Sequence, residues 1–258
     1  MFIVTLTRKG GSMRLFSLIS LFIFFCSTSA GRTLDDILHH LDDLYRSRSS
    51  RGVVRMVITT PHWERELEMR VWTRGEELTL IKITAPAREK GMGTLKAGRE
   101  MWNYLPAVNK VIKIPPSMMM GSWMGSDFKN DDLVKEYRFV EDYTFEWVTA
   151  PEEEGANIVI QGIPKPGRPI VWGSVRVTLR KNDLMPVSYL YYDQSGVPVR
   201  EMTFSRYKTF SGRLLPSVTE LKPLNKDGQK TTLIYEELSL DVAVPESFFS
   251  LRELRRAL

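Results

Sequence analysis

The chain has 258 residues, and its 36 lysines and arginines exceed its 31 acidic residues, which gives a formal net charge of +5. Charges of both signs are interleaved, as in Glu64-Arg65-Glu66, rather than gathered in the basic stripe that binds nucleic acid, so we exclude nucleic acid as a partner. The single cysteine, Cys26, excludes disulfides within the chain.

Residues 1–30 have the pattern of a secretory signal peptide. Arg14 precedes an apolar run from Leu15 to Phe25, and the small residues Thr28 and Ala30 suit cleavage after Ala30. The run is shorter than the roughly 20 apolar residues that span a membrane, so an uncleaved anchor is the weaker alternative. We therefore predict export, with a nearly neutral, cysteine-free mature chain, residues 31–258, that forms one domain.

The mature chain is predicted to begin with a helix and to continue as strands. Apolar residues recur at helical spacing after Thr33, which resembles the start of a capping box with Asp36. From Val53 onward the apolar period falls to two residues, and Gly-containing turns punctuate the pattern. The strand-like runs lie at 67–71, 76–84, 99–105, 108–114, 143–149, 156–162, 171–179, 186–192, 198–210, 214–222 and 230–240.

Short turns between consecutive strands favour antiparallel pairing. A sheet of about 11 strands must also curl to limit its bare edges. We therefore predict a mainly β fold in which a curved antiparallel sheet forms an incomplete, half-open β-barrel. Helices at the start, near residues 117–133 and at the end, where Phe248, Leu251 and Leu254 share one helical face, are predicted to cover the concave side.

A methionine-rich segment interrupts the strands. Four of the twelve methionines fall within seven residues, accompanied by a tryptophan and by two glycines, Gly121 and Gly125; these apolar residues are Met118, Met119, Met120, Trp123 and Met124. Methionine is unbranched and polarizable, so it fills irregular gaps in a core and also lines surfaces that must fit variable apolar partners. From residue types alone, a core plug and a pliable cover over an apolar space are equally good interpretations.

Searches for chemical sites give weak signals. His39 and His40 are adjacent on the first helix and point about 100° apart, so they do not share a metal readily. The polar run from Asp127 to Asp132 does not fit the twelve-residue calcium loop, and capping and turn formation explain it better. No serine or other nucleophile stands in a catalytic pattern with a histidine. We therefore predict no enzyme activity, no metal and no cofactor.

The run MWNYLPAVNKVIKIPP from Met101, and then MGSWMGSDFKNDDL ending at Leu133, resembles the LolA-like family of outer-membrane lipoprotein-sorting proteins. The stretches ITAPAREKGMGTL and VPESFFSLREL match the same pattern, so the resemblance covers essentially all of the mature chain. It implies a half-open barrel whose concave face holds acyl chains. It also implies a periplasmic carrier of lipoproteins or lipids between an inner-membrane transporter and an outer-membrane acceptor, with only peripheral membrane contact.

Candidate site residues follow from combining this resemblance with the strand pattern. We predict that the methionine-rich segment, Met118 to Met124, covers a cavity lined by Leu67, Met69, Val71, Trp102, Tyr104, Val175 and Val177. The inward face of strand 99–105 stays open, because Met101, Asn103 and Leu105 compete with Trp102 and Tyr104. The family's latching arginine also has open candidates, which are Arg65, Arg70, Arg88 and Arg99.

Two other functions remain open at this stage. The same cavity would suit an accessory or sensing subunit that stays docked to an envelope export complex. A periplasmic hydrolase is a remote third, because no nucleophile, base and orienting group occur together.

Overall fold

A computed structural model describes residues 32–44, 47–134 and 138–256. The predicted signal peptide and Cys26 lie outside the described residues. The chain from Arg32 onward forms one compact unit.

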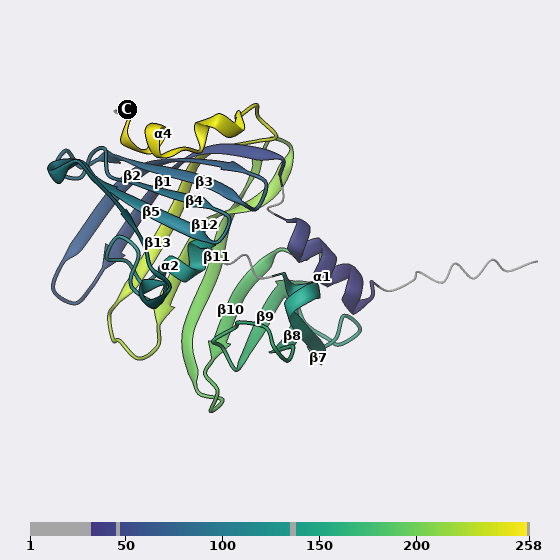
Figure 1. The fold of residues 1–258 in the computed structure, drawn as a ribbon. Coiled ribbons are helices and arrows are strands. Elements are labelled where there is room, and N and C mark those ends of the chain that lie inside the picture. The colour runs from purple at the N-terminus through teal and green to yellow at the C-terminus, as the bar shows by residue number, and fades with distance from the viewer. Residues whose placement is uncertain (1–31, 45–46, 135–137, 257–258) are drawn as a thin grey trace, which may run out of the picture. The chain divides into compact units, whose positions relative to one another are not determined.

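Thirteen antiparallel strands form one sheet in which nearly every strand pairs with its neighbours in sequence. The exception is the pairing of the first strand with the last, so that the order across the sheet is β6-β5-β4-β3-β2-β1-β13-β12-β11-β10-β9-β8-β7. Figure 1 shows that the sheet is curved. The strands are β1 Ser49–Thr59, β2 Glu64–Arg74, β3 Leu78–Ala85, β4 Gly93–Ala97, β5 Glu100–Leu105, β6 Lys110–Lys113, β7 Tyr143–Thr149, β8 Asn157–Pro164, β9 Ser174–Arg180, β10 Pro186–Tyr192, β11 Pro198–Phe210, β12 Arg213–Pro223 and β13 Lys230–Leu240.

The predicted fold class is confirmed: the protein is mainly β, and its curved antiparallel sheet does not close, because β6 and β7 remain as separate edges. The sequence pattern undercounted the strands, since the sheet has thirteen rather than about eleven. The hairpin register keeps the apolar residues of β1, β2 and β3 on a common face, as expected from their period of two.

The first helix, α1, spans Leu34–Asp43 and begins with the capping box that Thr33 and Asp36 predict. Its buried residues Ile37, Leu38 and Leu41 pack in a cluster with side chains of β7 to β10. The Asp42 carboxylate accepts hydrogen bonds from the backbone amides that open α3, Phe139–Asp142. The two helices therefore cover the β7–β10 part of the sheet together. No helix within the described residues is long and apolar enough to cross a membrane.

The methionine-rich segment is less helical than predicted. In place of the helix predicted near residues 117–133, a 3-10 turn, η2 (Pro116–Met118), begins this stretch and a short helix, α2 (Asn130–Val134), ends it. Met124 and Gly125 between them have φ angles of 50° and 76°, a left-handed conformation that an α-helix does not contain. Gly125, two residues after Trp123, therefore marks a turn of an irregular segment.

The C-terminal segment packs on the opposite face of the sheet from α2, as Figure 1 illustrates. It contains η3, Glu246–Phe248, and α4, Leu251–Arg255. Leu254 lies so close to β4 that a Cβ on Gly93 would be 2.9 Å from its Cδ1. The prediction that this helix covers the concave face is therefore wrong. Leu251 is 39% exposed and does not share the buried face predicted for it.

Candidate functional site

The concave face of the sheet presents a continuous apolar surface, which we call the floor. Its largest side chains come from alternate positions of β1, β2, β3 and β5, and all are buried: Met56, Ile58, Leu67, Met69, Ile81, Ile83 and Met101. Because strand side chains alternate between faces, polar neighbours of these residues point to the other side. Two of the predicted lining residues, Leu67 and Met69, are in the floor, and Val71 packs against it partly buried.

Residues 115–133, which we call the cover, lie against the floor. Trp123 is 2% exposed and Phe128 is also buried in the floor cluster, with Met119 and Met124 packed against it. The Trp123 indole Nε1 donates a hydrogen bond of 3.0 Å to Thr94 Oγ1 on β4. The segment therefore packs on the floor, as both the core-plug and the pliable-cover interpretations require.

Two of the predicted cover methionines point away from the floor. Met118 is 55% exposed and Met120 is 45% exposed. The alternation arises because the short 3-10 turn at Pro116–Met118 carries successive side chains to different sides. The cover thus has an apolar inner surface and an apolar outer surface.

The polar end of the cover is attached to the sheet by Asp127. Its amide donates to Thr231 Oγ1 at 3.0 Å, and its carboxylate accepts from Thr231 at 2.8 Å and from Gln229 at 2.6 Å. Thr231 lies on β13 and is fully buried. Asp132 accepts from the Lys129 amide at 2.8 Å and so forms the predicted turn. The aspartates of this run therefore both shape the cover and fix it to the sheet.

Arg65 on β2 holds the central turn of the cover. Its Nη1 donates to the Met124 carbonyl oxygen at 2.9 Å, and its guanidinium is paired with Glu89. A Cβ on Gly125 would lie 3.2 Å from the same nitrogen, so the glycine allows this approach. Of the four candidate arginines, Arg65 is the one that touches the cover, whereas Arg70, Arg88 and Arg99 are exposed.

Val175 and Val177 lie beneath helix α1, whereas Leu67 lies beneath the cover. Both are fully buried in the cluster that α1 completes, together with Tyr189 and Tyr191. They nevertheless share the concave face with the floor. The strand register forms one row from Val177 through Tyr189, Met202, Leu221, Thr231 and Ile58 to Arg65.

Trp102 and Tyr104 do not line this face, which corrects their predicted place. They pack with Leu80, Leu95 and Leu254 on the opposite side of the sheet, under the C-terminal segment. The register pairs Leu95 with Trp102, so the two side chains share a face. Met101 is the inward residue of β5 and is fully buried in the floor.

An arginine that the sequence analysis did not select joins the two halves of the concave face. Arg200 on β11 is 6% exposed, and its Nη1 is 2.9 Å from an Asp132 carboxylate oxygen on α2. Its guanidinium carbon lies 4.5 Å from the ring centroids of both Trp172 and Tyr191. Burial opposes the charged form of Arg200, but Asp132 and Tyr191 outweigh it and raise the pKa. The sequence signal that could have identified Arg200 is its spacing from Met202 and Phe204, because alternate residues of a strand lie on the same face.

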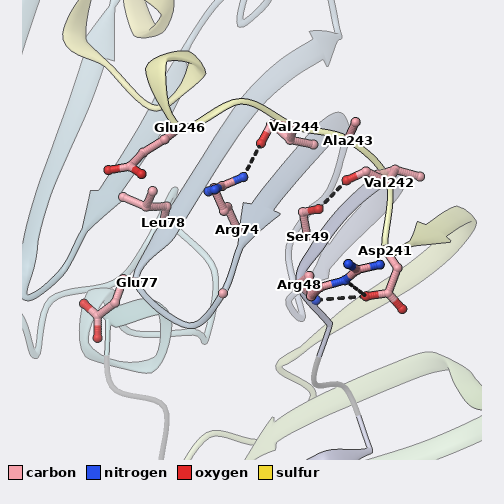
Figure 2. Close-up of a pocket in the computed structure, with 11 residues that line it drawn as sticks. Arg48, Ser49, Arg74, Glu77, Leu78, Asp241, Val242, Ala243, Val244 and Glu246 are labelled. Carbon is pink, nitrogen blue, oxygen red and sulfur yellow. Dashed lines mark hydrogen bonds and ion pairs between the residues drawn. The ribbon is translucent and has the colours of Figure 1, made fainter.

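A separate hollow of about 830 Å³ lies at the end of β13, where the chain leaves this strand (Figure 2). Its charged residues hold the segment that follows the strand. Arg74 Nη1 donates to the Val244 carbonyl at 3.0 Å, Ser49 donates to the Val242 carbonyl, and the Arg48 amide donates to Asp241 at 3.0 Å. The hollow is lined by apolar residues and by several charged side chains, including Arg74, Glu77 and Asp241, and so differs from the predominantly apolar pockets that hold apolar ligands.

Comparison with known proteins identifies the fold. A family model described as "Uncharacterized protein" matches residues 75–256. No curated protein matches the sequence. A solved DUF1329 family protein from Desulfovibrio piger is 23% identical with a TM-score of 0.75, and the match covers 85% of this chain and 96% of that one.

Two further solved structures have similar folds. A domain assigned to outer membrane lipoprotein-sorting proteins from Vibrio parahaemolyticus is 22% identical with a TM-score of 0.69, and the match covers 81% of this chain and 92% of that one. A LolA superfamily protein from Nitrosomonas europaea is 21% identical with a TM-score of 0.69, over 86% of this chain and 99% of that one. At these identities the likeness establishes a LolA-like fold.

Proposed function

The chain belongs to the family described as "Uncharacterized protein" and has a LolA-like fold, and we propose that it is a periplasmic carrier that binds the acyl chains of lipoproteins or lipids. The observation that carries this proposal is the apolar floor beneath the cover. In this proposal the acyl chains lie on the floor in place of the cover's inner side chains, and the carrier moves them between the inner and outer membranes.

The energetics suit an exchange between cover and ligand. Each buried methylene is worth about 0.8 kcal/mol, so part of an acyl chain offsets the loss of Trp123, Met119 and Met124 from the floor. The polar ties of the cover, such as those of Asp127, contribute about 1 kcal/mol each because water replaces them on opening. A ligand therefore needs on the order of ten buried methylenes, about the length of an acyl chain, to compete with the cover, and it is not held permanently.

The composition of the cover supports reversible opening. Met119 and Met124 pack against the floor through flexible side chains that adapt to either the floor or a bound chain. Arg65 binds the cover through a main-chain carbonyl, so this contact forms and breaks as a single hydrogen bond. In the proposed carrier Arg65 acts as the latch.

Purification from the periplasm followed by native mass spectrometry tests the proposal. We expect co-purified lipid or acylated protein, and displacement of a neutral fluorescent probe by added acyl chains. Protein that carries no lipid and binds neither probe nor acyl chain would refute the carrier. A stably bound membrane protein in the same preparation would favour the docked accessory subunit instead.

Substitution of the inner cover residues separates a cover from a core plug. We expect Met119→Ser, Trp123→Ser and Met124→Ser together to change acyl-chain uptake and release rates, because they weaken the cover's hold on the floor. The matched control combines Met118→Ser with Met120→Ser, which are the exposed methionines of the same segment. Lowered stability with unchanged uptake would identify a plug.

A further inference from the structure

Arg200 is an unusual residue for an apolar surface. It lies on the concave face between the floor and the α1-covered cluster, and Met202 two positions on packs against both. A buried cation costs considerable desolvation free energy unless it is paired, and an apolar residue of similar size often serves stability better. The position therefore calls for a role other than packing.

The pairing of Arg200 is incomplete. Asp132 provides one hydrogen bond at 2.9 Å from Nη1 to Oδ2. The Arg200 Nε and the Trp172 Nε1 are both buried without a hydrogen-bond partner among the described residues. Trp172 also lies against the guanidinium face. The two unpaired donors belong to side chains that contact each other, and neither donor has an acceptor among the described residues.

The counterion of Arg200 belongs to the cover. Asp132 is on α2, at the end of the cover, whereas Arg200 is on a central strand of the sheet. Movement of α2 away from the sheet would leave Arg200 on the concave face with its charge uncompensated. Such a state is strongly unfavourable, unless an incoming ligand brings an anion of its own.

We propose that Arg200 recognises a carboxylate or phosphate head group of the bound amphiphile, which replaces Asp132 when the cover opens. This inference rests on the proposed carrier function and adds the class of ligand. The anion accepts hydrogen bonds from Arg200 and from Trp172 Nε1, while the acyl chain lies on the floor. A planar guanidinium with its donors arranged as a fork matches both head groups.

The test compares amphiphiles that differ only in head group. Dodecanoate, dodecyl phosphate and dodecanol compete with the neutral probe Nile red for the purified protein, and inorganic phosphate is a fourth competitor. We expect both anionic amphiphiles to displace the probe at concentrations about tenfold lower than dodecanol, the difference that a charge-assisted hydrogen bond provides. Inorganic phosphate alone should not displace it.

Two variants assign the preference to this site. Arg200→Met should bring the anionic amphiphiles to the level of dodecanol, whereas Arg176→Met, at an exposed arginine of β9, should keep the preference. Asp132→Asn removes the internal competitor and should lower the concentration of dodecanoate needed by a larger factor than that of dodecanol. This second variant keeps the test valid if Arg200→Met fails to fold.

The outcomes separate this inference from the carrier function. Equal displacement by all three amphiphiles in the unaltered protein overturns the role of Arg200 and leaves the carrier intact. Failure of every amphiphile to displace the probe overturns both. Binding of inorganic phosphate as tightly as dodecyl phosphate would overturn the assignment to an amphiphile and identify a site for free anions.

Discussion

Asp127 attaches the cover to Thr231 on β13 and to Gln229 just before that strand, through its amide and both carboxylate oxygens. Asp127→Ala leaves the buried Thr231 hydroxyl with fewer partners, and an unsatisfied buried group costs about 1–3 kcal/mol. We expect the free energy of unfolding in urea to fall by about this amount and the cover to become more sensitive to protease. Asp227→Ala, in the exposed turn before β13, should change neither, and equal losses in both variants would contradict this role.

His40 gives a pH dependence whose sign is set by burial. Desolvation, followed by the charge of Arg32, lowers the pKa of His40 against the opposing charges of Asp183 and Asp43. The folded state therefore keeps His40 neutral, and the unfolded state gains a proton first, below its pKa of about 6.5. His40 therefore does not reduce the free energy of unfolding above that pH, and it reduces this free energy progressively as the pH falls below it.

Two adjacent histidines make this prediction testable in one helix. In urea unfolding between pH 7 and 5, we expect His40→Gln to reduce the loss of stability on acidification. His39→Gln should act in the opposite sense, because the hydrogen bond of His39 to the Asp35 carbonyl raises the pKa of His39, which favours the folded state at low pH. An unchanged slope in His40→Gln would show that His40 is not the group responsible.

The sequence located residues by type and period, but it did not reveal partners far along the chain. Leu67 and Met69 were predicted as lining residues from alternation alone, and they are in the floor. Arg200 was missed because its partner Asp132 is 68 residues away, and nothing local connects them. The sequence did not show whether Met101 or Trp102 faces inward, because these adjacent residues are both apolar and the strand therefore lacks an apolar–polar alternation at this point.

At the level of elements, the two faces of β5 make a direct test of the site. Met101→Ser places a hydroxyl on the floor and should weaken acyl-chain affinity about tenfold, from the loss of roughly 1.5 kcal/mol of apolar burial. Trp102→Ser alters the opposite face and should leave affinity unchanged, although both variants will lose stability. Affinity that depends on Trp102 and not on Met101 would place the ligand under the C-terminal segment instead.

The cover and the C-terminal helix are the elements that the sequence described least well. A helix was expected over residues 117–133, but tertiary contacts override local propensity here. The side of the sheet that α4 covers depends on the close approach of Leu254 to Gly93, which periodicity does not encode.

At the scale of the whole molecule, consecutive hairpins and the return of β13 to β1 produce a sheet of thirteen strands with two separate edges. Such a sheet curls without closing, and its concave face needs covers that are not strands. Short turns and alternation were sufficient to predict this architecture. Helix α1 and the methionine-rich segment each lie over one part of the concave face. In the proposed carrier, acyl chains bind to the part beneath the methionine-rich segment, which is the less regular of the two elements.

The most direct test of the central claim, that acyl chains bind beneath the cover, is to lock the cover in place. Asp127 Oδ2 and Thr231 Oγ1 are 2.8 Å apart, and the predicted mature chain has no cysteine, so Asp127→Cys with Thr231→Cys introduces one selective crosslink. Binding of a fluorescent acyl chain is measured before and after reduction, with each single variant as control. We predict that the oxidised protein does not bind and that reduction restores binding; equal binding by the oxidised and reduced forms would contradict the account.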